Sequence, residues 1–177
     1  EIGVRLVGSE MCIRDRSNPG ENEYFPMSSR RAAEILKDQI DRSVAAGANL
    51  RTGAEIDDTT AYFSPAVLTD LPVGSEPYYE EFFGPVAEIY KVSSEEEAVE
   101  LANNSYQGLG GAVFSDDVEK ATKVADQIDT GMIHVNLDQY FSAILPFGGV
   151  KRSGFGRELS VFALDEFVNK QYRYIND

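Results

Sequence analysis

The sequence predicts an α/β fold in which a mostly parallel sheet is covered by helices. From residue 86 onward, short apolar segments alternate with amphipathic ones in the order strand, helix, strand, helix, strand, which is the order of βαβ units. The chain has 177 residues, of which 42% are hydrophobic and 26% are charged, so it can bury a core and differs from a disordered chain.

The charge balance excludes several classes of partner. The net charge is −14, whereas nucleic acids and anionic membranes require a basic patch, so we expect neither as a partner. No apolar run approaches the roughly 20 residues that cross a bilayer. One cysteine (Cys12) and one histidine (His134) leave no disulfide pair and little metal chemistry. With no recognisable signal peptide, we expect a cytoplasmic protein without a metal site.

The first 16 residues have neither helical nor strand periodicity. Residues 7–16 look like a translated sequencing adaptor, and we interpret residues 1–16 as a non-native leader. If the segment is native, it is expected to be a poorly ordered end.

The first predicted helix begins at Ser28 or Ser29, either of which can cap it, and ends before Gly47 in a left-handed C-cap. Its apolar stripe is predicted at Ala32, Leu36, Ile40 and Val44. Residues 62–68 contain Pro65 and are predicted to be an edge strand or an irregular one.

Further elements follow from capping and apolar patterns. Strands are predicted at 86–92, 110–114 and 131–136, and a terminal one at 168–175. Two helices are predicted to begin at capping boxes, and a short third helix at 159–167. The boxes pair Ser93 with Glu96 or Ser94 with Glu97, and Asp116 with Glu119.

A glycine-rich loop at residues 146–158 reads PFGGVKRSGFGRE. Four glycines and a proline in 13 positions disfavour both helix and strand, and long loops in compact domains are usually functional. This run resembles the C-terminal signature of the aldehyde dehydrogenase superfamily at every fixed position, and its context is most like the succinate-semialdehyde branch. The resemblance implies that residues 17–167 form part of the catalytic domain and that residues 168–177 form an oligomerisation strand.

A second motif, EEFFGPV at residues 80–86, is similar to the Glu-x-Phe-Gly-Pro-Val element of that family. The resemblance implies that Glu81 accepts hydrogen bonds from the nicotinamide ribose of NAD or NADP and that Phe83 packs beside the nicotinamide ring. A carboxylate and an aromatic wall are suited to these roles.

The same resemblance places Phe141, Ser142 and Phe147 in the aldehyde pocket, although core packing explains the two phenylalanines nearly as well. Asn136 is expected to support the active-site loops, and His134 to be a packed strand residue. Four charged residues of the glycine-rich loop are interpreted as groups that hold it in place: Lys151, Arg152, Arg157 and Glu158.

The family oxidises aldehydes to acids with a cysteine nucleophile, a glutamate base and a Rossmann-type domain. No segment of this sequence matches the glutamate base or the Rossmann-type domain. Cys12 does not match the nucleophile, because its neighbours differ from the nucleophile's context. We therefore expect part of an NAD(P)⁺-dependent aldehyde dehydrogenase that forms a homo-oligomer and has no activity by itself. One alternative is a non-catalytic oligomerisation module. Another is a small hydrolase using Ser153 or Ser160, although neither serine lies in a nucleophile elbow.

Overall fold

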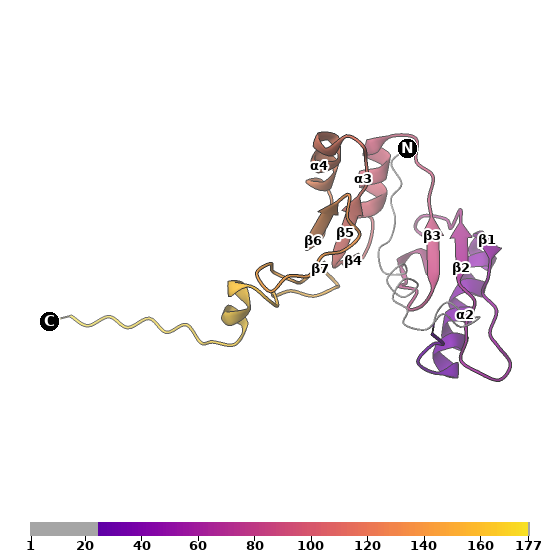
Figure 1. Cartoon of the computed structure of the whole chain (residues 1–177), viewed down its shortest axis with the longest axis horizontal. Helices are drawn as coiled ribbons and strands as arrows, with labels where there is room; N and C mark the ends of the chain where they lie inside the picture. The colour runs from indigo at the N-terminus through magenta and orange to yellow at the C-terminus, as the bar shows by residue number, and fades with distance from the viewer. Residues whose placement is uncertain (1–24, 177) are drawn as a thin grey trace. The chain divides into compact units, whose positions relative to one another are not determined.

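A computed structural model describes residues 25–176 of the chain (Figure 1). It divides into two compact units, the first ending at Ala102 and the second beginning at Asn103, and each unit is described by itself. The leader interpreted at residues 1–16 lies outside the described residues.

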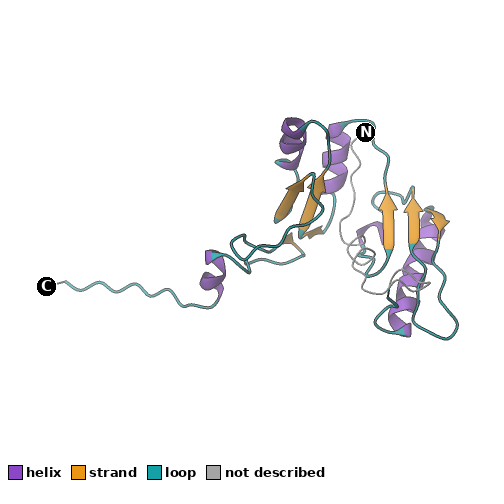
Figure 2. Ribbon diagram, viewed as in Figure 1, coloured by secondary structure: helices purple, strands orange, loops and turns teal. Residues whose placement is uncertain are grey.

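In the first unit, a long helix packs against a three-stranded sheet (Figure 2). The helix is α2 (Arg30–Ala46), and the sheet has the order β1 (Asn49–Thr52), β2 (Ala66–Thr69) and β3 (Val86–Ile89). β1 and β2 are antiparallel, whereas β2 and β3 are parallel. The core joins these layers through Leu36 and Ile40 of the helix and Leu68 of β2, all nearly inaccessible to solvent.

Both predicted caps of α2 are confirmed. The Ser29 hydroxyl accepts from the Ala32 amide at 3.1 Å, and Gly47 has a φ of 119°, which favours glycine. The predicted apolar stripe is wrong by one residue at two points, because the buried face consists of Ala33, Leu36, Ile40 and Ser43. Ser43 can be buried because its hydroxyl donates to the Gln39 carbonyl at 2.8 Å.

The prediction for residues 62–68 is also wrong, because β2 is the central strand of its sheet. Pro65 precedes β2, so its missing N–H removes no ladder bond, and the Ala66 amide donates to the Pro85 carbonyl at 2.9 Å. β1, which pairs with the edge of β2 opposite β3, was not predicted. All four of its residues are exposed, and they carry no hydrophobic alternation.

The last helix of the first unit, α3 (Glu95–Asn103), runs across the boundary between the units. Of the two predicted capping boxes, the Ser94–Glu97 pair is present, with the Ser94 hydroxyl accepting from the Glu97 amide at 3.1 Å. The Glu97 carboxylate accepts from the Ser93 amide at 2.7 Å. Between β2 and β3 lies a single 3₁₀ turn, η1 (Pro77–Tyr79).

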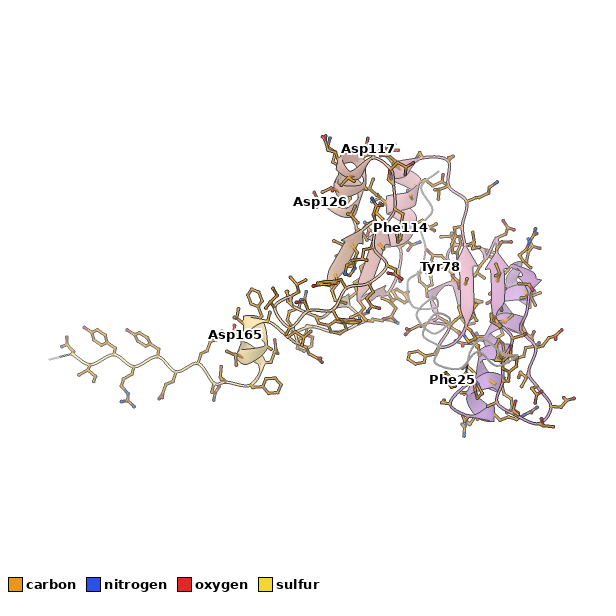
Figure 3. The ribbon with its side chains drawn as sticks, in the orientation of Figure 1. Phe25, Tyr78, Phe114, Asp117, Asp126 and Asp165 are labelled. Atoms are coloured by element: carbon orange, nitrogen blue, oxygen red, sulfur yellow. The ribbon has the colours of Figure 1, made fainter. Side chains whose placement is uncertain are left out.

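The second unit contains the parallel pair β5 (Gly110–Val113) and β6 (Met132–Val135), linked through α4 (Val118–Ala125). Asp117 caps α4 at its N-terminus, one residue later than predicted, and Asp126 ends it (Figure 3). The helix begins one residue later than predicted because the Asp117 carboxylate, not that of Asp116, accepts from the Lys120 amide. β4 (Gln107–Gly108) and β7 (Val150–Lys151) form an antiparallel pair.

A mixed α/β fold is therefore confirmed, but the mostly parallel sheet is not. The described strands form three small sheets with two parallel and two antiparallel pairings. The helix predicted at 159–167 is a 3₁₀ helix, η2 (Val161–Glu166), with no buried residue. Residues 168–176 form no regular element here, and the oligomerisation strand stays a prediction. Within residues 25–176, no helix is long and apolar enough to span a membrane.

Candidate functional site

The first candidate surface is the segment between η1 and β3, residues Glu80, Glu81, Phe82 and Phe83, which we call the 80–83 strip. Its backbone is extended at Glu80, with φ −86° and ψ 144°. In an extended chain, successive side chains point to opposite sides. Burial alternates along the strip, with Glu80 and Phe82 half-buried and Glu81 and Phe83 exposed, which gives it an inward face and an outward face.

The inward face is held by contacts to the rest of the unit. Arg42 of α2 donates two hydrogen bonds to the Glu80 carboxylate, at 2.6 and 2.7 Å. Gln39 adds a third at 3.1 Å. The Arg42 guanidinium lowers the pKa of Glu80 below its ordinary value, so this carboxylate is ionised and paired. Phe82 packs against the hydrophobic core.

The outward face carries the two residues predicted to hold the cofactor. Glu81 is exposed, and its carboxylate has no hydrogen-bond or ion-pair partner among residues 25–176. The Phe83 side chain is 81% exposed. A free carboxylate and a free aromatic ring on one face can receive a ribose and a flat ring.

The turn after the strip packs closely on side chains of the first unit at Gly84. A Cβ on Gly84 would overlap the side chain of Leu36 and lie 3.1 Å from the Met27 Cε atom. The Gly84 amide donates to the Phe82 carbonyl at 2.8 Å. Close packing on α2 and this tight turn hold the end of the strip where β3 begins.

A buried carboxyl that the sequence analysis did not identify lies on β3. The Oε2 atom of Glu88 accepts from the Tyr90 hydroxyl at 3.1 Å, while its buried Oε1 atom has no partner among the described residues. Burial raises the pKa of Glu88 to about 7 and raises that of Tyr90 as well. The ring of Tyr78 (Figure 3) meets the Tyr90 ring edge-on at 6.0 Å. Glu88 can thus exchange a proton near neutral pH.

One sequence signal could have revealed Glu88. It lies two residues after the buried Val86, and side chains at this spacing share one face of a strand. A glutamate on the inward face of a short strand is expected to be at least partly buried.

In the second unit, two of the three predicted pocket residues lie together. The rings of Phe141 and Phe147 are 5.6 Å apart with a tilt of 32°. Phe141 is 54% exposed and Phe147 is half-buried, so the pair forms an apolar wall that solvent can reach. Ser142, the third, begins a turn: its hydroxyl accepts from the Ile144 amide at 3.4 Å and its carbonyl accepts from the Leu145 amide at 3.2 Å.

Main-chain hydrogen bonds from residues further along the chain hold this wall. Phe147 and Glu158 exchange amide-to-carbonyl bonds of 2.8 and 2.7 Å. The Ser160 amide donates to the Ala143 carbonyl at 2.8 Å, although Ser160 has a φ of 53° that non-glycine residues rarely adopt. Ala143 and Phe147 are therefore tied to residues at, or just after, the end of the glycine-rich loop.

The structural interpretation of the charged loop residues is confirmed for Lys151, Arg152 and Arg157. One nitrogen of Arg157 donates to the carbonyls of Gly149 and Gly156, at 2.9 and 2.6 Å. Lys151 donates to the Asn103 carbonyl at 2.9 Å, and Arg152 stacks 4.0 Å from the centre of the Tyr106 ring. Glu158 contributes through its backbone bonds to Phe147.

The hydrolase alternative gains no support from the two serines. The Ser153 hydroxyl accepts from the Gly108 amide at 3.0 Å and lies 3.1 Å from the Gln107 Oε1 atom, so it holds β4. The Ser160 hydroxyl accepts from the Phe162 amide at 3.3 Å. A nucleophile would need a base as its partner.

His134 is a strand residue, as predicted, and Asn136 supports a neighbouring loop. His134 lies in β6 opposite Ala112. The Asn136 side chain binds both the amide and the carbonyl of Ser115, each at 2.8 Å, and so supports the loop after β5. Within the described part of the chain, no group of three acidic, histidine or cysteine side chains could hold a metal ion.

Comparison with known proteins decides the family. A model described as the aldehyde dehydrogenase family matches residues 10–172. The chain belongs to the aldehyde dehydrogenase family. It is 48% identical over 147 residues to a succinate-semialdehyde dehydrogenase [NADP(+)] of Deinococcus radiodurans, with 82% of this chain and 31% of the relative covered. A probable succinate-semialdehyde dehydrogenase [NADP(+)] of Synechocystis sp. is 40% identical over 146 residues, covering 80% and 32%.

Solved structures agree with these sequence matches. The succinic semialdehyde dehydrogenase of Streptococcus pyogenes, in complex with NADP⁺, superposes with a TM-score of 0.83 at 45% identity, covering 90% of this chain and 35% of that one. A betaine aldehyde dehydrogenase of Staphylococcus aureus, in complex with NAD⁺, gives a TM-score of 0.78 at 34% identity, covering 84% and 30%. This aldehyde dehydrogenase chain thus spans about a third of the length of the relatives it matches.

Proposed function

We propose that this chain forms part of an NAD(P)⁺-dependent aldehyde dehydrogenase that oxidises succinate semialdehyde to the carboxylic acid. The observation that carries the proposal is the outward face of the 80–83 strip, where Glu81 has no partner among the described residues and the Phe83 ring is exposed. The names of the relatives in Deinococcus and Synechocystis support both the substrate and a preference for NADP⁺.

The residues of the strip fit the proposed cofactor. The Glu81 carboxylate would accept hydrogen bonds from the ribose hydroxyls, and the Phe83 ring would form a wall beside the nicotinamide. The bound dinucleotide would supply the hydride acceptor. Glu81 and Phe83 would bind and orient it, with no proton transfer assigned to either residue.

The pair Phe141 and Phe147 would provide an apolar wall for the aldehyde. Aromatic walls exclude water and restrict the orientation of a small substrate. Ser142 would donate its hydroxyl hydrogen to the far carboxylate of succinate semialdehyde, while the hydroxyl oxygen keeps accepting from the Ile144 amide at 3.4 Å. The turn contact and the proposed substrate contact of Ser142 are therefore compatible.

The chain alone is proposed to be inactive, because the nucleophile, the base and the nucleotide-binding domain of the family are not among its matched motifs. We also propose a cytoplasmic homo-oligomer in which residues 168–177 pair with another subunit. One observation favours the rival function as an oligomerisation module: Phe167 is 86% exposed and Tyr172 is 84% exposed.

The test joins residues 25–176 of this chain to the remaining part of the Deinococcus radiodurans relative, in place of its matching segment. We expect the chimera to oxidise succinate semialdehyde with NADP⁺. Glu81→Gln should raise the KM for NADP⁺ about ten- to a hundredfold, because charge-assisted hydrogen bonds to the cofactor are lost.

Glu76→Gln, which changes an exposed glutamate five positions earlier, is the matched control and should alter the KM less than twofold. An equal effect of the two substitutions would remove the cofactor role of Glu81. Turnover by the unmodified 177-residue chain would contradict its proposed inactivity. A chimera that assembles but stays inactive would favour the oligomerisation module.

A further inference from the structure

We propose that Arg42 and Gln39 of α2 are positioning residues that set which face of the 80–83 strip meets the cofactor. The inference rests on the proposed function, because it takes Glu81 and Phe83 as the residues that contact the dinucleotide. It adds two residues, about 40 positions earlier in the chain, that would touch neither cofactor nor substrate.

The first part of the argument is the geometry of Arg42. Its Nη1 and Nη2 atoms bind the two oxygens of Glu80 at 2.6 and 2.7 Å, which is a two-pronged contact. Its Nε atom binds Asp38 at 3.0 Å, one turn earlier on the same helix. All three guanidinium nitrogens are therefore occupied, and the plane of the guanidinium fixes the plane of the Glu80 carboxylate.

The second part is the double contact of Gln39. Its amide nitrogen lies 3.1 Å from the Glu80 carboxylate and 3.2 Å from the Glu81 carbonyl oxygen. A side-chain amide nitrogen has two hydrogens, so it can serve both acceptors at once. Gln39 therefore ties the main-chain carbonyl of Glu81 to α2, as well as the side chain of Glu80.

The third part is the choice between two adjacent acids. Glu80 and Glu81 are the same residue type, so the charge of Arg42 could pair with either carboxylate. The Gln39 contact requires the Glu81 carbonyl and the Glu80 carboxylate to lie on the same side, toward the helix. Glu80 and Phe82 are half-buried whereas Glu81 and Phe83 are exposed, so holding Glu80 against the helix leaves the side chains of Glu81 and Phe83 open to solvent.

The consequence is that α2 selects the acid that stays free. Without the contacts that hold Glu80 against α2, Arg42 or a neighbouring polar group could pair with the Glu81 carboxylate. The strip would then lose one acceptor for the ribose. Arg42 and Gln39 thus act on cofactor binding through Glu80, and their effect should appear in the affinity for the dinucleotide more than in the rate at saturation.

The experiment uses the chimera described above, with NADP⁺ as the varied substrate. Arg42→Met should raise the KM for NADP⁺ about tenfold and change kcat at saturating NADP⁺ less than threefold. Arg42→Lys, which keeps the charge but loses the two-pronged geometry, should give an intermediate KM. Hydrogen exchange of the amides in the 80–83 strip should accelerate in the Met variant.

Lys37→Met is the matched control, because Lys37 pairs with Asp41 on the same helix in the same i,i+4 manner and makes no described contact with the strip. It should change the KM less than twofold. If Arg42→Met destabilises the chimera too much to assay, Gln39→Leu preserves every charge and should raise the KM about threefold.

The outcomes separate the two proposals. An effect of Glu81→Gln together with no difference between Arg42→Met and Lys37→Met would overturn the positioning role alone. No effect of Glu81→Gln would overturn the cofactor role of the strip and the positioning role with it. A parallel fall of kcat in all the variants would indicate general damage and would also overturn the inference.

Discussion

The 80–83 strip and the glycine-rich loop at 146–158 are both irregular segments, but they are held in different ways. The strip is fixed by side chains, since Arg42 and Gln39 bind the carboxylate of Glu80. The loop is fixed through its backbone, since Arg157 binds two carbonyls and Phe147 pairs with Glu158 through main-chain atoms. The conformation of the strip therefore depends on particular side chains, whereas the conformation of the loop depends on close contacts between main-chain segments.

The largest effect that this difference predicts is at Gly131, just before β6. An added Cβ would overlap the Gly148 carbonyl oxygen and lie 2.7 Å from the Gly149 Cα atom, and neither is a side chain that can move aside. We expect Gly131→Ala to lower the free energy of unfolding by about 4 kcal/mol or more. Urea denaturation followed by circular dichroism would measure the change.

The control for this prediction is Gly154 in the glycine-rich loop. It has a φ of 108°, but a Cβ added there would have no atom within 4 Å, so Gly154→Ala meets only backbone strain. Its cost should be about 1–2 kcal/mol. Equal losses at both glycines would show that close main-chain approach does not hold this loop.

A smaller effect is expected from Arg157→Met. This change removes charged donors from the carbonyls of Gly149 and Gly156, and Gly149 is buried. We expect a loss of about 2–3 kcal/mol of unfolding free energy, because a buried acceptor is left without its partner. Arg152→Met in the same loop removes only a stacking contact with Tyr106 and should cost about 1 kcal/mol or less. The reverse order of the two losses would contradict the backbone-held loop.

The smallest effect concerns Glu88 and the pH dependence of the first unit. The folded pKa is about 7, against an ordinary value of 4.5, so the folded chain binds this proton more tightly than the unfolded chain does. The stability that the neutral form contributes is complete below about pH 4.5 and is lost as the pH rises to about 7. We expect this loss to be about 1–3 kcal/mol, measured by urea denaturation across that range.

Glu88→Gln should remove this slope, because the amide has no proton to release in the window. Glu97→Gln is the control of opposite sign. Hydrogen bonds from Ser93 lower the pKa of Glu97, so its contribution is lost only as the pH falls below the usual glutamate range. If Glu88→Gln retained the wild-type slope between about pH 5 and 7, the burial of this carboxyl would not control it.

Local chemistry could be predicted from the sequence, and distant partners could not. Ser29, Gly47 and the Ser94–Glu97 box were identified because a cap acts within four residues. Pro65 was misinterpreted because its effect depends on whether it lies inside the strand or just before it. β1 was missed because exposed strands carry no hydrophobic pattern.

The candidate site shows the same division. Glu81 and Phe83 were proposed because a contiguous motif resembles a family element, and both side chains are exposed in the structure. Their anchors were not found, since Arg42 lies 38 positions from Glu80 and nothing in the sequence pairs the two. Ser142 was assigned to the substrate from the resemblance, which gave no sign of the bond that its hydroxyl accepts from a turn amide.

The alternation of the 80–83 strip also limits how this segment can change in length. Inserting or deleting a single residue between Glu80 and Gly84 would exchange the two sides, turning an acid toward the core and an inner phenylalanine toward solvent. Related chains could therefore replace individual residues here more readily than they could gain or lose one. The spacing from Glu80 to Gly84 is therefore as important to the proposed binding surface as the side chains between them.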